Sequence, residues 1–242
     1  MKVRPYEKVS LIYDSLMENV SYSSWSNYII EVAQIHSQKF DKALELAAGN
    51  CNISKRICKR FKYYLATDIS LQMLKYSEAN GLNLLCCDMT SLPVKIKFDL
   101  IFSSFDSVNY LLRQKDILAL FKEVKNVLNP DGIFTFDVSL ESNSINFIYP
   151  KTIEGRKNGL LYQRVSYYKK HSRIHHNSFY ISDGSSNNYR EEHKQKIYKL
   201  ETYFKLAEIT GFKVVACYDC FTCNEIKSIS ERAQFVLKKI NS

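Results

Sequence analysis

Three carboxylates follow successive apolar segments in the first ninety residues of this 242-residue chain. Glu45 ends the first segment, Asp68 ends the second, and Asp88 comes directly after the third. Because parallel strands bring their carboxyl ends to one edge of a sheet, we expect these three side chains to share that edge. Carboxylates placed there can accept hydrogen bonds from ribose hydroxyls and amino groups. The spacing therefore predicts a nucleotide-binding edge.

A turn of small residues separates the first strand from a predicted helix. Ala47, Ala48 and Gly49 follow Glu45, and residues 50–52 are predicted to open a helix that continues through position 58. Backbone N–H groups and the helix dipole at such a corner favour an anionic or polar ligand. A dinucleotide motif would need glycines at 47, 49 and 52, and a phosphate loop would need a G-x-x-x-x-G-K-[S/T] run. Neither pattern is present, which disfavours nicotinamide, flavin and ATP or GTP hydrolysis.

The elements that must position this corner alternate between strands and helices. Strands are predicted at 42–46, 63–67, 84–87, 98–103, 133–138, 212–218 and 233–238. Apolar residues at helical spacing predict helices in the segment before the first strand and at 70–76, 115–128 and 200–210. Turn residues 129–132 end the helix at 115–128, and Gly211 ends the helix at 200–210. This order predicts an α/β fold with a Rossmann-like, seven-stranded, mainly parallel sheet and helices on both faces.

The pattern changes between residues 146 and 199. Three β-rich stretches, 160–169, 173–181 and 189–198, are separated by turn residues and indicate an antiparallel insertion. We expect a single domain over 1–242 in which 146–199 forms a lid that carries Tyr162, Tyr168 and Tyr180 towards the site. Residues 1–40 are expected to form a helical cap. Their aromatic residues could fold over a pocket at the strand ends or simply pack on the core.

The corner resembles motif I of class I S-adenosylmethionine-dependent methyltransferases, an acidic residue followed by G-x-G-x-G. Glu45, Ala47, Gly49 and Cys51 occupy those positions. The resemblance extends, in the family's order, to Asp68, 88–89, 98–101 and 105–111, and it covers almost the whole chain. Both ends of the chain are similar to a bacterial group within this family. The segment after strand four is similar to amino-sugar N-methyltransferases.

The resemblance implies S-adenosyl-L-methionine as cofactor. Asp68 would bind the ribose, Asp88 the adenine amino group, and Glu45 the methionine amino group, unless Glu45 only orders the loop. The complete cofactor-binding set that we predict is Tyr13, Glu45, Ala47, Ala48, Gly49, Asp68, Ile69, Met73, Asp88, Met89, Ser103 and Phe105. Ala47 and Cys51 depart from the family pattern and could weaken cofactor binding. We expect alanine to be tolerated at 47 if its φ is negative.

Methyl transfer from a sulfonium is an in-line displacement, so orientation and desolvation can supply most of the acceleration. No catalytic residue follows from the sequence. Asp106, Asn109 and Tyr110 are candidates on the acceptor side because they follow strand four, although Tyr110 could equally pack against the next helix. The histidines of the insertion, His171, His175 and His176, are weaker candidates for a base, since hairpin histidines are usually exposed.

Cys217, Cys220 and Cys223 form a C-x-x-C-x-x-C pattern that lacks a nearby fourth ligand, so no metal site is expected. The net charge of +9 comes from lysines scattered among acidic residues, which favours a solvated surface over a nucleic-acid site.

The chain lacks an apolar run long enough for a signal peptide or a membrane span, so a cytoplasmic protein, monomer or homodimer, is expected. The preferred acceptor is a small molecule, modified on nitrogen or oxygen. The alternatives are an RNA or tRNA methyltransferase and a non-catalytic nucleotide-binding relative.

Overall fold

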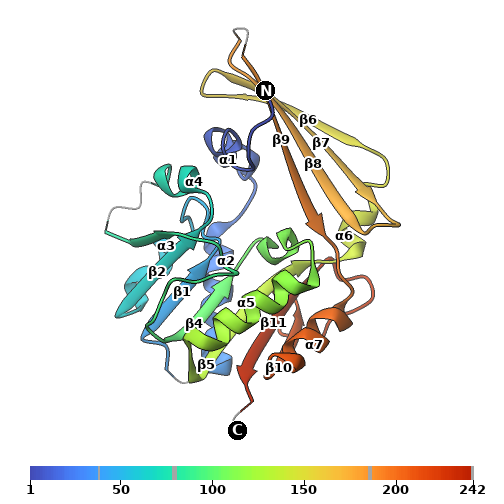
Figure 1. The fold of residues 1–242 in the computed structure, drawn as a ribbon. Coiled ribbons are helices and arrows are strands. Elements are labelled where there is room, and N and C mark those ends of the chain that lie inside the picture. Colours follow the sequence, from blue (N-terminus) through green and yellow to red (C-terminus); the bar gives the residue numbers. More distant parts are fainter. Residues whose placement is uncertain (38, 78–80, 185–186, 241–242) are drawn as a thin grey trace.

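A computed structural model of the chain describes residues 1–37, 39–77, 81–184 and 187–240. Its main sheet has seven strands in the order β10-β11-β5-β4-β1-β2-β3 (Figure 1). The strands are β1 Lys42–Leu46, β2 Tyr63–Asp68, β3 Asn83–Cys86, β4 Phe98–Ser103, β5 Leu128–Ser139, β10 Phe212–Asp219 and β11 Arg232–Lys239. The first five are parallel, and β11 runs antiparallel to both neighbours. The predicted fold class is confirmed.

Helices cover both faces of this sheet. On one face, α2 (Tyr22–His36) and α3 (Ser54–Ile57) pack in a core with side chains of β1, β2 and β4. On the other, α5 (Gln114–Val127) and α7 (Leu200–Ile209) pack against β4, β5 and β11. The apolar residues of α5 recur every three or four positions and are buried, as an amphipathic helix requires.

Some predicted boundaries differ from the structure. The helix after the small-residue turn begins at Ser54 instead of 50–52, because Cys51 has a φ of +58°, outside the helical region. Residues 129–132 follow the end of α5 as predicted, but they belong to the start of β5. The helix after β2, α4 (Leu71–Lys75), buries Met73 and Leu74, whereas Tyr76, predicted on the same face, is 51% exposed.

The insertion forms a separate four-stranded antiparallel sheet, called here the second sheet (Figure 1). It consists of β6 Lys151–Lys157, β7 Leu160–Lys169, β8 Ile174–Ser182 and β9 Asn188–Lys196, and the short helix α6 (Glu141–Ile145) precedes it. Three of these strands match the predicted ones. The edge strand β6 was not predicted, because its side chains are almost all exposed and show no alternation.

Residues 1–20, called here the N-terminal arm, attach to the second sheet. Val9 of the 3₁₀ turn Val9–Leu11 and Ile12, just before α1 (Tyr13–Leu16), pack against Tyr162, Phe179 and Ile181. At the start of the arm, Lys2 forms an isolated bridge with Arg190 of β9. The arm thus lies between the second sheet and the carboxyl edge of the main sheet (Figure 1).

Candidate active site

A cavity of about 530 Å³ lies where the carboxyl ends of β1, β2 and β4 meet the N-terminal arm. Its volume is in the range of pockets that hold small molecules. The loops after the strands line one side, and aromatic residues of the arm line the other. The lining residues that the site description uses are Tyr6, Tyr13, Tyr22, Glu45, Ala47, Ala48, Gly49, Asp68, Ile69, Met73, Asp88, Met89, Ser104, Phe105 and Tyr110.

The loop after β1 turns through three left-handed residues. The φ angles are +55° at Ala47, +57° at Gly49 and +58° at Cys51. These are the three positions at which the motif usually has glycine, and the left-handed region explains why. The condition set for tolerating alanine at 47, a negative φ, is not met: this residue adopts the left-handed turn despite its Cβ. At Gly49 a Cβ would also lie 3.3 Å from Cε of Met73.

Asp68 connects this loop to the start of α4. Its Oδ2 accepts a hydrogen bond from the Gly49 N–H at 2.7 Å, and its Oδ1 accepts one from the Ser70 N–H at 2.7 Å. Ser70 then caps α4 by accepting from the Met73 N–H. The Asp68 side chain is buried, which raises its pKa. Each carboxylate oxygen retains a lone pair, so Asp68 can hold the loop and still accept from a ligand.

Glu45 lines the same cavity, but its Oε2 already accepts hydrogen bonds from the hydroxyls of Ser54 and Tyr64. The residue is only 3% exposed, and burial raises its pKa to about 7. Through Ser54, Glu45 orders the beginning of α3. Of the two roles predicted for Glu45, these contacts support ordering of the loop.

Asp88, Met89 and Ile69 form the outer end of the cavity. Oδ1 of Asp88 accepts from the backbone N–H and the hydroxyl of Thr90, both at 2.8 Å. Ile69 is a large apolar side chain that is 67% exposed. A flat ring bound at this end would cover it.

Aromatic side chains form the opposite wall. Phe105, after β4, packs against Tyr22 and Trp25 of α2, with ring centroids 5.6 Å and 4.6 Å away. Tyr6 of the arm reaches Tyr110, and the two hydroxyls lie 2.8 Å apart. Burial raises the pKa of both phenols, so each stays protonated at neutral pH.

Two residues of β9 support this wall and were not among the predicted ones. Nδ1 of His193 lies 3.2 Å from the Tyr110 hydroxyl, and its Nε2 lies 3.2 Å from Oε2 of Glu191. Both side chains are buried, at 3% and 0% exposure. One signal was available in the sequence: residues two apart on a strand share a face, so a Glu and a His at 191 and 193 point the same way.

Ser103, Asp106 and Asn109, among the predicted site residues, lie outside the cavity lining. Ser103 is buried one residue before Ser104, which does line it.

Asp106 faces Arg232 of β11, with Oδ2 3.2 Å from a guanidinium nitrogen, and its N–H donates to Asp137 at 2.8 Å. Arg232 also pairs with Asp137, so these three residues form an ion cluster behind the site, in which only Asp137 is fully buried.

The amide of Asn109 is fully buried and joins chain segments. Its Nδ2 donates to the carbonyls of Ser139 and Lys196, and its Oδ1 accepts from the Ser139 N–H. Asn109 therefore fixes the turn that carries Tyr110.

The three tyrosines expected to point from the second sheet into the site are placed elsewhere. Tyr162 packs on the N-terminal arm, Tyr168 donates to Glu141 at 2.8 Å, and Tyr180 is exposed. Tyr6 and Tyr13 of the N-terminal arm line the cavity instead.

The histidines predicted as weak candidates also lie outside the lining. His175 contacts Ser144, and burial lowers its pKa to about 4; His176 stacks on Tyr167. His171 is exposed.

The cysteine pattern near β10 does not form a metal centre among the described residues, in which no group of three metal-binding side chains was found. Burial raises the pKa of the Cys217 and Cys220 thiols to about 12, which keeps them protonated. Within the described ranges, no helix is long and apolar enough to cross a membrane.

Comparison with known proteins agrees with this geometry. Residues 43–132 match the family described as "Methyltransferase domain". YqeM of Bacillus subtilis (strain 168), named as a methyltransferase, is 28% identical over 97% of each chain. A solved S-adenosylmethionine-dependent methyltransferase from Clostridium acetobutylicum ATCC 824 is 29% identical over 97% of this chain and 98% of its own, with a TM-score of 0.81. The matched domain, the full-length relative and the solved structure together support a class I S-adenosylmethionine-dependent methyltransferase.

The methyltransferase fold extends to more distant proteins. CalS10, an amino pentose methyltransferase from Micromonospora echinaspora solved with S-adenosylmethionine bound, is 15% identical, has a TM-score of 0.73, and covers 94% of this chain and 96% of its own. At this identity the likeness shows a shared fold.

Proposed function

We propose that this methyltransferase binds S-adenosyl-L-methionine in the described cavity and transfers its methyl group to a nitrogen or oxygen of a small molecule. The observation that carries the proposal is the Asp68 carboxylate, buried at the carboxyl edge and bonded to the Gly49 N–H, inside a cavity of about 530 Å³. This arrangement leaves a carboxylate at the carboxyl edge of the sheet facing one ligand.

The residues present fit this cofactor. Asp68 would accept hydrogen bonds from the ribose hydroxyls. Asp88, whose carboxylate lies at the exposed end of the cavity, would accept a hydrogen bond from the adenine amino group. Ile69 and Met89 would cover the ring. Ser104 supplies a further test of fit, because its hydroxyl is buried in the cavity wall without a partner among the described residues. A ligand with polar groups would satisfy it.

The acceptor side is apolar and aromatic, enclosed by the arm and backed by the second sheet. Tyr6, Tyr13 and Phe105 line it, a surface that suits a small acceptor better than a nucleic-acid strand. In this proposal the second sheet and the N-terminal arm together act as the lid. The aromatic rings of the arm exclude water and leave the acceptor little freedom.

The bound cofactor supplies an electrophilic methyl group on a sulfonium. The protein's own contribution is to hold the acceptor atom in line with it and to exclude water. Tyr110 and Tyr6 supply hydroxyl groups on the acceptor side of the cavity. Asp106 and Asn109 support the turn from behind.

A labelling experiment tests the acceptor class. The protein is incubated with S-adenosylmethionine carrying a labelled methyl group, with either a bacterial small-metabolite extract or total RNA. We expect label in small molecules and none in RNA, with Asp68→Ala as the inactive control. Label in RNA alone would contradict the proposed acceptor class.

A further inference from the structure

A chain of four polar groups, two half-buried tyrosine hydroxyls followed by a buried histidine and a buried carboxylate, leads from the cavity wall into the second sheet. The Tyr6 and Tyr110 hydroxyls are 2.8 Å apart, Tyr110 lies 3.2 Å from Nδ1 of His193, and Nε2 of His193 lies 3.2 Å from Glu191. The first two residues line the cavity and the last two do not. The contacts are continuous, so a proton could pass along them by local transfers.

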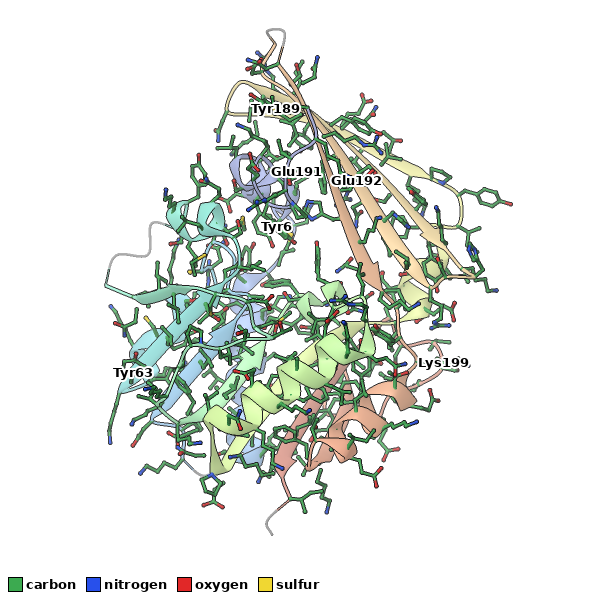
Figure 2. All side chains as sticks on the ribbon, viewed as in Figure 1. Tyr6, Tyr63, Tyr189, Glu191, Glu192 and Lys199 are labelled. Atoms are coloured by element: carbon green, nitrogen blue, oxygen red, sulfur yellow. The ribbon has the colours of Figure 1, made fainter. Side chains whose placement is uncertain are left out.

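Glu191 fixes the orientation of this chain. Its Oε1 accepts from the Val9 N–H at 2.8 Å and from the Lys8 N–H, and its Oε2 accepts from the Tyr6 N–H at 2.8 Å. With these donors directed at its two oxygens, Glu191 acts as a hydrogen-bond acceptor. His193 then places Nε2–H towards Glu191, which leaves Nδ1 as the acceptor for Tyr110. Figure 2 shows Tyr6 next to Glu191, between the second sheet and the main sheet.

The same reasoning sets the direction of the hydroxyls. Tyr110 donates to Nδ1 of His193, so it accepts from Tyr6. Tyr6 then has an oxygen lone pair for a donor in the cavity, and no other hydroxyl partner of Tyr6 is found in the part of the chain that the structure describes. A hydroxyl or N–H of an acceptor is the group that could donate to it.

We propose that Tyr6, Tyr110, His193 and Glu191 form a proton relay for an acceptor that loses a proton, a hydroxyl or an amine N–H. The proposal rests on the methyl-transfer function proposed above. As the bond from the acceptor atom to the methyl carbon forms and the methyl–sulfur bond breaks, the acceptor proton passes to Tyr6. The Tyr6 proton passes to Tyr110, and the Tyr110 proton to Nδ1 of His193. The imidazolium formed is paired with the Glu191 carboxylate.

The relay also links chemistry to closure of the site. Tyr6 belongs to the arm, and the carboxylate that orients His193 is the one that holds the arm. The relay is therefore complete only when the arm is attached to the second sheet. A purely structural His193–Glu191 pair would hold the arm and fix the same tautomer, but it would leave Nδ1 of His193 insensitive to Tyr110 and kcat insensitive to His193.

Nitrogen NMR of the full-length protein labelled in its five histidines distinguishes these cases. The spectrum is recorded at neutral pH with S-adenosylhomocysteine, and His193→Gln assigns the resonances. We expect His193 to be protonated on Nε2 alone, and Tyr110→Phe to shift its Nδ1 resonance. The matched control, Tyr167→Phe, removes a hydroxyl beside His176 on the same sheet and should leave His193 unchanged.

Protonation of His193 on Nδ1, or an Nδ1 resonance that does not shift in Tyr110→Phe, would overturn the relay. This test does not require the acceptor to be identified. Lack of S-adenosylhomocysteine binding by the wild-type protein would overturn the proposed function instead.

With a labelled acceptor from the extract, His193→Gln should lower kcat by about 100-fold and leave S-adenosylhomocysteine affinity unchanged. An unchanged kcat in a variant that only melts earlier would show a structural role.

Discussion

The two sides of the cavity are built in different ways. The cofactor side consists of loops that each follow a strand of the main sheet, and its contacts, such as Gly49 to Asp68, join neighbouring strands. The acceptor side is assembled from the arm and β9, which lie more than 180 residues apart in the chain. The cofactor side therefore depends on local turn geometry, and the acceptor side depends on a few long-range contacts that hold two segments together.

Removal of Glu191 tests the long-range side with the largest expected effect. Glu191→Ala leaves the N–H groups of Tyr6, Lys8 and Val9 without their acceptor, and it leaves His193 unpaired. We expect the free energy of unfolding in urea to fall by about 3 kcal/mol.

The matched control is Glu192→Ala, one residue along β9, whose carboxylate pairs with exposed Lys2 and Arg190. Surface pairs contribute about 0–1 kcal/mol. Equal losses for the two variants would remove the distinction between the two sides.

Glu45 tests the cofactor side through pH. Its pKa rises from 4.5 to about 7 on folding because of burial, so the folded protein binds the proton more tightly. Its contribution to stability is therefore complete below pH 4.5 and is lost as the pH rises towards about 7. In the wild type, we expect the free energy of unfolding to decline between pH 4.5 and about 7 by on the order of 3 kcal/mol or less. Glu45→Gln should remove this decline.

Urea unfolding at several pH values measures this decline. The variant retains a side-chain oxygen for Ser54 and Tyr64. A wild-type curve and a Glu45→Gln curve that run parallel would show that Glu45 does not titrate there.

Ala47 tests the same side with the smallest effect. Ala47→Gly removes the Cβ that strains the left-handed conformation, which stabilises the folded state by about 1–2 kcal/mol. The greater conformational entropy of glycine in the unfolded chain offsets about 0.5–1 kcal/mol of this gain. A net gain of roughly 0.5 kcal/mol is expected in thermal or urea unfolding.

Ala48→Gly is its control, because Ala48 is not among the residues with positive φ and should lose stability. A loss in both variants would mean that the turn at Ala47 carries little strain.

These differences explain what could be predicted from sequence. Strand-end carboxylates such as Asp68 are visible because a single apolar run places them, and the family pattern assigns their order. The sign of φ at Ala47 was not predictable, since the residue type argued against the conformation that the turn requires. His193 was missed because its function depends on Tyr110 and Glu191, contacts set by how β9 meets the arm. The tyrosines of the second sheet were misplaced for the same reason.

In the proposed function, the Asp68 carboxylate holds S-adenosylmethionine at the edge of the main sheet. Calorimetric titration of the full-length protein with S-adenosylhomocysteine tests it most directly, with Asp68→Ala beside Asp116→Asn, a surface carboxylate on α5. We predict saturable binding by the wild type and by Asp116→Asn, and affinity at least about tenfold weaker in Asp68→Ala, the loss of one or more charge-assisted hydrogen bonds. No heat with the wild type, or equal affinity in Asp68→Ala, would contradict the claim.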